Sequence, residues 1–221
     1  THQGECTRVF AFPWPQSGQP ECYPLGSDPW AAPTERDGLF YVPAHFGPGS
    51  GPGTGEGTIV RIDPVAAPGE NGTLVHAFSG PDGRLPEDAL TLGQDGHLYG
   101  VTAAGGSAVA SGIDSGTIFR ISPDGSYEKL HDFAPPVSFP AGRLLEIAPG
   151  EFVGTVSNGP NGGAVFRFAM AAENSAPVAS DSATTTAEDV AISGQLSVID
   201  ADAGDTLVFS IVSNGTLGDP V

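Results

Sequence analysis

The sequence predicts an all-β protein, and three observations support that prediction. The 221 residues include 32 glycines and 21 prolines, and both residues disfavour helix interiors. Short runs of β-branched and aromatic residues alternate with Gly, Pro, Asp and Asn, which is the pattern of strands and turns. Similar runs recur along the chain, which is typical of architectures built from repeated sheets.

Three kinds of segment recur. The first places Asp-Gly or Gly before an aromatic or aliphatic run, at 37–42, 95–100 and, more weakly, 150–154. The second begins with Gly and carries an Arg near its end, at 57–62, 116–121 and 163–168. The third ends in Phe, at 73–78 and 128–133, and the N-terminal segment 7–12 matches it. We call residues at matching positions repeat-equivalent.

The middle repeat predicts four antiparallel strands, at 89–92, 97–102, 117–121 and 128–133. Asp95-Gly96 and Pro123-Asp124-Gly125 are the turn signals between neighbouring strands. Repeated four-stranded sheets are the blades of a β-propeller. The prediction is therefore a propeller-like repeat domain over 1–170.

The other repeats predict fewer strands, which bears on closure. The first offers strands near 39–44, 57–63 and 73–78, and the third offers 144–148, 151–156 and 163–169 without a fourth. We expect the N-terminal strand 7–12 to complete the last blade. About three blades per chain fall below the usual range of about four to eight. Either two copies close one ring, or the chain is part of a longer protein.

The repeats resemble the choice-of-anchor GloVer-type tandem-repeat family of bacterial secreted proteins. The resemblance covers about 35–170 and rests on Asp95–Thr102, Gly105-Gly106 and Gly116–Gly125. It implies a secreted or surface-located propeller-like array, and it implies no catalytic residue.

Composition changes after Met170. Residues 171–176 read as a linker, and 177–221 resemble the start of a cadherin-like or VCBS-type domain of bacterial surface proteins, which is an Ig-like β-sandwich. We expect strands at 177–181, 190–198, 205–212 and 215–221. A sandwich needs about seven strands, so the segment is predicted to be an incomplete sandwich that is truncated, disordered or completed by another chain.

The tail holds the candidate metal site. Closely spaced carboxylates supply the oxygen ligands that calcium prefers. Asp200, Asp202 and Asp205, with Glu188 and Asp189 nearby in sequence, have that character, and the cadherin-like resemblance implies interdomain calcium. The alternative is a solvated acidic turn.

Cysteine content and charge bear on compartment and partners. Cys6 and Cys22 lack metal-binding spacing and are predicted to form a disulfide, which favours an oxidising compartment. The formal net charge of −18 argues against nucleic-acid and membrane-surface partners. No apolar run is long enough to predict membrane insertion. We expect an extracellular or bacterial cell-surface location.

Other candidate site residues recur or cluster. His76 and His131 are repeat-equivalent, as are Arg61, Arg120 and Arg167. Recurrence favours structural roles, with the arginines paired to acids between blades; the alternative is three guanidinium groups that converge on an anion. Three aromatic residues near the cysteines either pack in the core or a loop, or form a sugar-stacking platform: Trp14, Tyr23 and Trp30.

The function predicted from these patterns is non-catalytic: a structural or adhesive surface protein that self-assembles as a homo-oligomer or, through strand donation by its tail, as a filament. The alternative, from another class, is a propeller protein that binds or cleaves extracellular polysaccharide. A nucleophile-elbow motif is absent from the sequence. In so acidic a chain, pairs of carboxylates are expected to occur by chance, so such a pair is no evidence for glycosidase chemistry.

Overall fold

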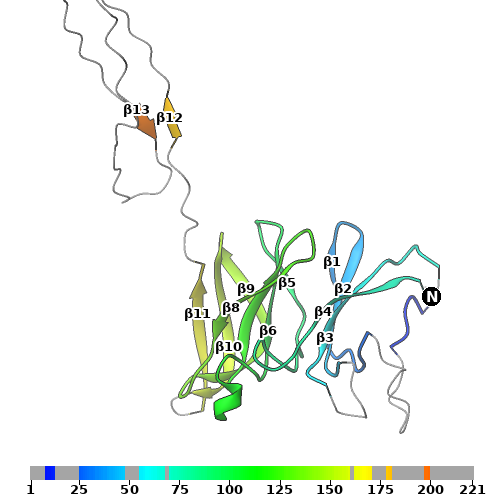
Figure 1. Cartoon of the computed structure of the whole chain (residues 1–221), viewed down its shortest axis with the longest axis horizontal. Coiled ribbons are helices and arrows are strands. Elements are labelled where there is room, and N and C mark those ends of the chain that lie inside the picture. The colour runs from blue at the N-terminus through cyan, green and yellow to red at the C-terminus, as the bar shows by residue number, and fades with distance from the viewer. Residues whose placement is uncertain are drawn as a thin grey trace, which may run out of the picture. The chain divides into compact units, whose positions relative to one another are not determined.

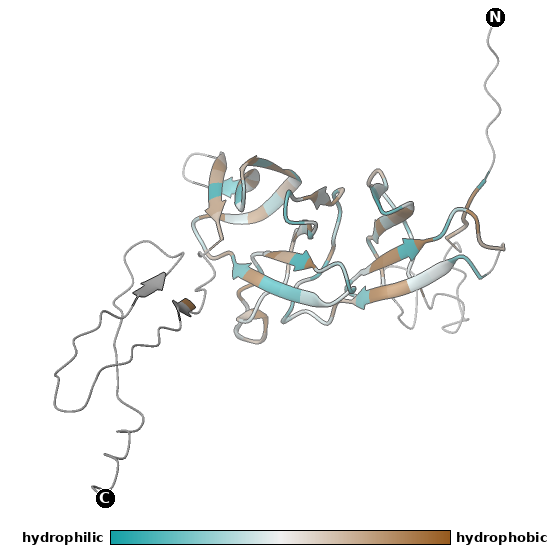
Figure 2. Ribbon diagram, turned by 90° about the horizontal axis from the view of Figure 1, so that it is seen from above, coloured by the Kyte–Doolittle hydropathy of each residue, from teal (hydrophilic) through white to brown (hydrophobic). Residues whose placement is uncertain are grey.

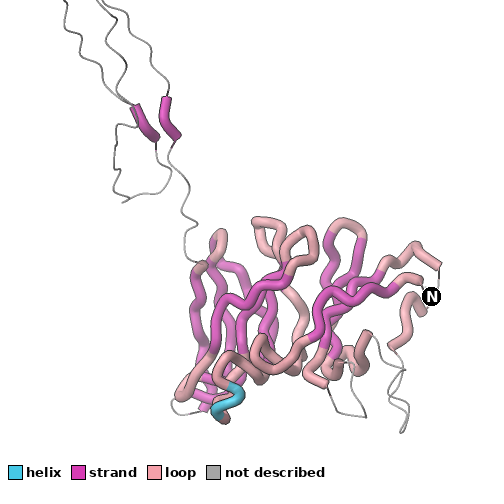
Figure 3. Tube along the Cα trace, in the orientation of Figure 1, coloured by secondary structure: helices cyan, strands magenta, loops and turns pink. Residues whose placement is uncertain are grey.

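The computed structural model describes residues 8–12, 25–47, 55–67, 70–159, 162–170, 178–180 and 197–199. The chain divides into two compact units, Thr1–Met170 and Ala171–Val221. Within the described ranges the elements are strands apart from one turn of 3₁₀ helix, η2 (Val109–Ser111), so the all-β prediction is confirmed (Figures 1 and 3). No helix in these ranges has the length and apolar character needed to span a membrane.

The described residues of the first unit form three antiparallel sheets. Sheet 1 has the order β1-β2-β3-β4, and sheet 2 has the order β5-β6-β7-β8. The strands of sheet 1 are β1 (Thr34–Arg36), β2 (Leu39–Ala44), β3 (Thr58–Ile62) and β4 (Gly72–Ala77). Those of sheet 2 are β5 (Thr91–Leu92), β6 (Leu98–Thr102), β7 (Thr117–Ile121) and β8 (Tyr127–Asp132).

Sheet 3 has three strands in the order β11-β10-β9. They are β9 (Ser138–Ala148), β10 (Glu151–Gly159) and β11 (Gly162–Ala169). In sheets 1 and 2 the third strand pairs with a fourth strand, whereas β11 pairs with β10 alone among the described residues. The three sheets follow one another in an open row rather than a closed ring (Figure 1).

The predicted strands agree closely with the observed ones where β-branched residues are dense. The bounds predicted for β2 and β7 match the observed bounds. The structure adds β1, which the sequence did not predict because Thr-Glu-Arg has no apolar alternation. It also begins β9 six residues earlier than predicted, at Ser138.

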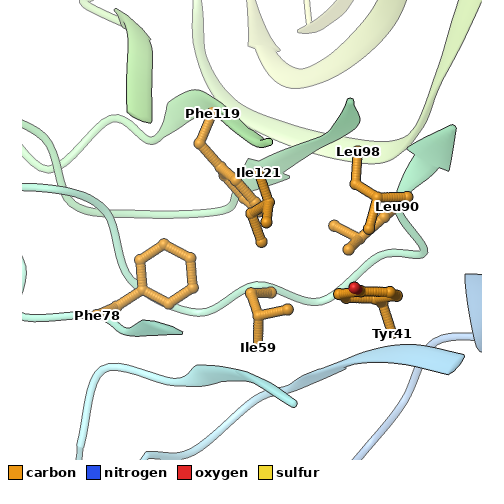
Figure 4. Packing of buried hydrophobic residues seen from close by; sticks show 7 residues of the cluster. All are labelled: Tyr41, Ile59, Phe78, Leu90, Leu98, Phe119 and Ile121. Atoms are coloured by element: carbon orange, nitrogen blue, oxygen red, sulfur yellow. The ribbon is translucent and has the colours of Figure 1, made fainter. Parts of the chain in front are cut away.

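Neighbouring sheets pack face to face. We call the side of a sheet toward the preceding part of the chain its front face, and the side toward the following part its back face. Tyr41 and Ile59 on the back face of sheet 1 meet Leu98, Phe119 and Ile121 on the front face of sheet 2 (Figure 4). Alternation along a strand sends successive side chains to opposite faces, so one strand serves two interfaces. Figure 2 shows the resulting mixture of apolar and hydrophilic residues along the strands.

The second interface repeats the first. Tyr99, Val101 and Ile118 on the back face of sheet 2 pack with Phe152 and partly buried Phe166 of sheet 3. Repeat-equivalent residues take equivalent places: Phe78 at the end of β4 contacts Phe119, with ring centroids 5.4 Å apart, and Phe133 contacts Phe166 at 5.0 Å.

The N-terminal segment corrects the sequence prediction of closure. Residues 8–12 form no strand, and they lie at sheet 1 rather than completing sheet 3. Phe10 and Phe12 pack on the front-face cluster of Val42, Val60 and Ile62. The Asn71 side chain donates to the Val9 carbonyl, 2.9 Å away. Segment 8–12 therefore covers part of the apolar front face of sheet 1 and removes it from water.

The second unit is described in two short strands. β12 (Val178–Ser180) and β13 (Ser197–Ile199) pair in antiparallel register, with Val178 opposite Ile199. They fall within the predicted strand 177–181 and at the end of 190–198. The predicted strands 205–212 and 215–221 lie outside the described residues.

Candidate functional site

The strongest recurring feature is the set of contacts between successive sheets. Thr34 is buried, and its hydroxyl donates to the Leu90 carbonyl at 2.7 Å. Its repeat-equivalent, the buried Thr91, donates to the Leu144 carbonyl. Each threonine thus hydrogen-bonds the first-strand region of the following sheet.

A second recurring contact is an X-Pro turn that begins each repeat. Its members are Asp28-Pro29, Leu85-Pro86 and Phe139-Pro140, and the residue before each proline has a left-handed φ of 58°, 56° and 56°. Such a φ is costly for residues other than glycine, so the surrounding packing must impose it. A Cβ on Gly57 would overlap the Pro86 ring, and one on Gly116 would overlap the Pro140 ring.

Sequence reasoning did not identify these turns. The signal that could have found them is a proline four residues before Pro33, Leu90 and Leu144, which are repeat-equivalent positions.

Arg36 links sheet 1 to sheet 2 without a repeat counterpart. The side chain is buried, and its guanidinium donates to the Ile121 carbonyl at 3.3 Å and to the Tyr41 hydroxyl at 2.7 Å. It also lies 4.5 Å from the Tyr41 ring centroid. Arg36 therefore holds the start of sheet 1 against the turn that leaves β7.

The repeated arginines do not converge on one site. Arg120 pairs with Glu128 on the adjacent strand at 2.7 Å, and Arg167 pairs with Glu151 on the adjacent strand at 2.5 Å. Arg61 faces Thr73 in the same register. The two ion pairs lie within sheets, so the expectation of pairing between blades is corrected.

The two repeated histidines differ in surroundings. His76 Nε2 lies 2.8 Å from an Asp82 carboxylate oxygen, and its ring stacks on Tyr127 with centroids 3.7 Å apart. Burial lowers the pKa of His76 and outweighs the opposing pull of Asp82. Ser79 donates to Asp82 rather than to the imidazole, so the cluster is not a nucleophile–base pair. His131 is exposed and contacts Phe133 edge-on.

An acid–base pair that the sequence did not predict ties two loops together. Arg84 forms an ion pair with Asp114 and lies 3.6 Å from Glu56. The Arg84 guanidinium lowers the pKa of the Asp114 carboxyl. The Gly105 amide also donates to Asp114, so the carboxylate acts in loop structure.

Of the predicted aromatic platform, the structure describes Trp30, which is 64% exposed and stacks on His45 with centroids 4.1 Å apart. His45 is buried and lies 3.4 Å from Glu87. Burial lowers the pKa of His45 despite the carboxylates of Glu87 and Asp28. Trp14 and Tyr23 lie outside the described residues.

The predicted metal and disulfide residues are not among those described. These are Asp200, Asp202, Asp205, Glu188 and Asp189 for calcium, and Cys6 and Cys22 for the disulfide. Within the part of the chain that is described, no three His, Cys, Asp or Glu side chains group in a way that could hold a metal ion.

A family model described as the Gloeobacter/Verrucomicrobia repeat matches residues 20–216. The chain belongs to this repeat family. Membership agrees with the tandem repeat predicted from the sequence and with the resemblance to the GloVer type. A search of curated proteins finds no match. The Gloeobacter/Verrucomicrobia repeat match includes most of the tail, for which the cadherin-like character stays a prediction.

Proposed function

We propose that the chain is a non-catalytic structural or adhesive module, located outside the cell or at the bacterial surface, that associates with copies of itself. The observation that carries the proposal is that the recurring residues make contacts between successive sheets. Thr34 and Thr91 hydrogen-bond the following sheet, and the X-Pro turns pack against glycines of the preceding sheet. These recurring residues thus hold one sheet against the next.

A propeller-like arrangement belongs to this proposal. The first strands β1, β5 and β9 are successive neighbours, as the inner strands of propeller blades are. Three sheets in an open row leave a face at each end of the row. A ring or an extended array requires further sheets from outside this chain's 1–170 unit.

The tail is proposed to be a cadherin-like, incomplete sandwich that is completed by another chain. Strand addition by a neighbour would satisfy its unpaired backbone groups, and a head-to-tail contact of that kind builds a filament. Calcium bound by Asp200, Asp202 and Asp205, with Glu188 and Asp189, would stiffen the segment. These proposals rest on the sequence and on the pairing of β12 with β13.

A second candidate function is polysaccharide binding or cleavage. The observation that favours it is the exposed ring of Trp30 on a buried histidine, since the C–H face of a sugar ring can stack on the apolar face of an exposed aromatic ring. An aromatic ring alone supplies no acid or nucleophile for cleavage.

The test displays the full chain on the surface of a host cell and compares adhesion and cell clumping with undisplayed controls. The purified chain is assayed in parallel for release of reducing ends from polysaccharides. We expect clumping or adhesion without hydrolysis. Release of reducing ends by the purified chain contradicts the proposal. So does a displayed chain whose host cells neither adhere nor clump. Binding to glycans that is lost in Trp30→Ala supports the second candidate instead.

A further inference from the structure

We propose that the back face of sheet 3 is a docking surface for the front face of sheet 1 on a second copy of this chain. The proposal deepens the proposed function, because it names the partner and interface of self-association. It rests on the comparison of the two interfaces inside the molecule with the two surfaces at the ends of the row.

The back face of sheet 3 is exposed where its counterparts are covered. Ile59 on sheet 1 and Ile118 on sheet 2 are fully buried by the following sheet, whereas the repeat-equivalent Val165 on β11 is 75% exposed. Leu145 and Ile147 on β9 are 62% and 52% exposed. The same face carries the Arg167–Glu151 ion pair, as the covered back face of sheet 2 carries the Arg120–Glu128 pair. Exposed apolar side chains grouped on one sheet face are typical of a surface that a partner covers.

The front face of sheet 1 carries the complementary half. In the interior, Tyr41 of the preceding sheet packs among Leu90, Leu98 and Ile121 (Figure 4). The corresponding place on sheet 1 is an apolar groove lined by Pro33, Phe40, Val42 and Ile62 and flanked by Phe10 and Phe12. The groove can take side chains from a preceding back face.

The contact between an X-Pro turn and a glycine of the preceding repeat is also left incomplete at the two ends of the row. Pro86 and Pro140 are buried against Gly57 and Gly116 of the preceding repeat. Pro29, at the start of the row, is exposed. Gly163, the repeat-equivalent of Gly57 and Gly116, is exposed, and among the described residues no proline lies against it. Docking one copy on another would bring Pro29 to Gly163.

The segment 8–12 lies on sheet 1 as β4 lies on sheet 2. His76 of β4 stacks on Tyr127, and the repeat-equivalent of His76, Phe10, lies at Gly72, which is repeat-equivalent to Tyr127. Segment 8–12, although it is not a strand, therefore occupies the place that a fourth strand of a preceding sheet would take. In a docked pair it would lie beside the edge of β11 that has no partner strand among the described residues.

The pairing inside the molecule fixes the expected register between copies. Thr58 faces Ala77 across β3 and β4, and Thr117 faces Asp132 across β7 and β8. The same register places Ala164 of one copy opposite Ala11 of the next. Facing residues of antiparallel strands are close enough for a disulfide.

The interface is tested with the full chain by covalent trapping. Two variants, Ala164→Cys and Ala11→Cys, are mixed in equal amounts and oxidised, and the products are mapped by mass spectrometry. We expect a bond between residues 11 and 164, which in this mixture forms only between copies. Replacing Ala164→Cys by Val65→Cys is the control, because Val65 is 90% exposed and lies in the turn after β3, outside the strands. That control should give no bond to residue 11.

The reversible association is tested by sedimentation at micromolar concentration. Val165→Asp is expected to shift the chain to the single-copy mass, and Val65→Asp to leave the assembly unchanged. The proposal is overturned by absence of the 11–164 bond together with equal masses for the two aspartate variants. It is also overturned by a single-copy species in which hydrogen exchange shows protection of the β11 amides that point away from β10, because residues of the same chain would then cover the edge. Cell adhesion by a chain that stays single-copy would leave only the adhesive part of the proposed function standing, and would reject this interface together with self-association. Assembly that is unchanged in Val165→Asp would leave self-association standing and place it at another surface.

Discussion

At the scale of single residues, buried polar side chains decide how one sheet meets the next. Arg36 is 4% exposed and reaches backbone carbonyls of sheet 2 with a planar group that has several donors. A residue of this kind contributes through geometry as much as through charge, because a buried carbonyl left without a donor keeps its full desolvation cost.

Arg36→Lys tests this role. The lysine keeps the positive charge, but its single ammonium group cannot serve the carbonyls and Tyr41 at once. We expect a loss of about 1–3 kcal/mol in the free energy of unfolding, measured by urea denaturation. Arg167→Lys, at a pair whose arginine side chain is 63% exposed, should change it by less than about 0.5 kcal/mol. Equal effects of the two substitutions would contradict the role assigned to Arg36.

Two histidines predict how stability depends on pH. Burial lowers the pKa of both His45 and His76 below the ordinary value of 6.5, so the unfolded chain binds protons more readily than the folded chain. Their contribution to stability is therefore complete above pH 6.5 and declines as the pH falls through the folded values. Titration of the imidazole resonances by NMR should give midpoints below 6.5 for both. A midpoint above 6.5 for either histidine would show that its carboxylate neighbour dominates burial.

At the scale of elements, the prediction from sequence succeeded where strands are apolar and bounded by turn residues. β7 is predicted at its observed bounds because Thr-Ile-Phe-Arg-Ile lies between Gly116 and a Pro-Asp-Gly turn. The polar strand β1 has no such pattern and was missed. Segment 8–12 was recognised as a fourth-strand type, but similarity between repeats identifies the kind of strand and not the sheet that it meets.

The candidate site was less predictable than the fold. Arginine and histidine recurrence indicated structural roles, yet the partners of Arg120 and His76 depend on cross-strand register and on loop residues such as Asp82. The X-Pro turns were not predicted because the residue before the proline differs in each repeat. Asp28, Leu85 and Phe139 share a left-handed φ but not a residue type.

The close approach of a proline to a glycine at each internal interface gives a prediction at this scale. Gly116 has a φ of 93° and lies beneath Pro140, whereas Gly112 has a φ of 79° with open space at its Cβ position. Gly112→Ala should cost about 1–2 kcal/mol from the left-handed backbone alone. Gly116→Ala should cost more, because the same backbone cost is joined by overlap with the Pro140 ring and with the Thr102 carbonyl oxygen. Thermal or urea unfolding that ranks the two equally would show that the surroundings of Gly116 can make room for a methyl group.

At the scale of the whole molecule, the 1–170 unit is a row of sheets with one reused interface. The same positions bury Ile59 beneath sheet 2 and Ile118 beneath sheet 3, and leave Val165 exposed at the end. A heterologous contact between the two ends either closes a ring or continues as an open array. The net charge of −18 opposes association, so added salt that screens this repulsion should strengthen it.

The most direct measurement is the absolute mass of the full chain by light scattering after gel filtration, in calcium and in chelator. The account predicts a multiple of the single-chain mass that is the same in both buffers, since the sheet-to-sheet contact is apolar. Larger material present in calcium alone would add a tail contact through Asp200, Asp202 and Asp205. A single-chain mass in both buffers at micromolar concentration would contradict self-association, and with it the central claim.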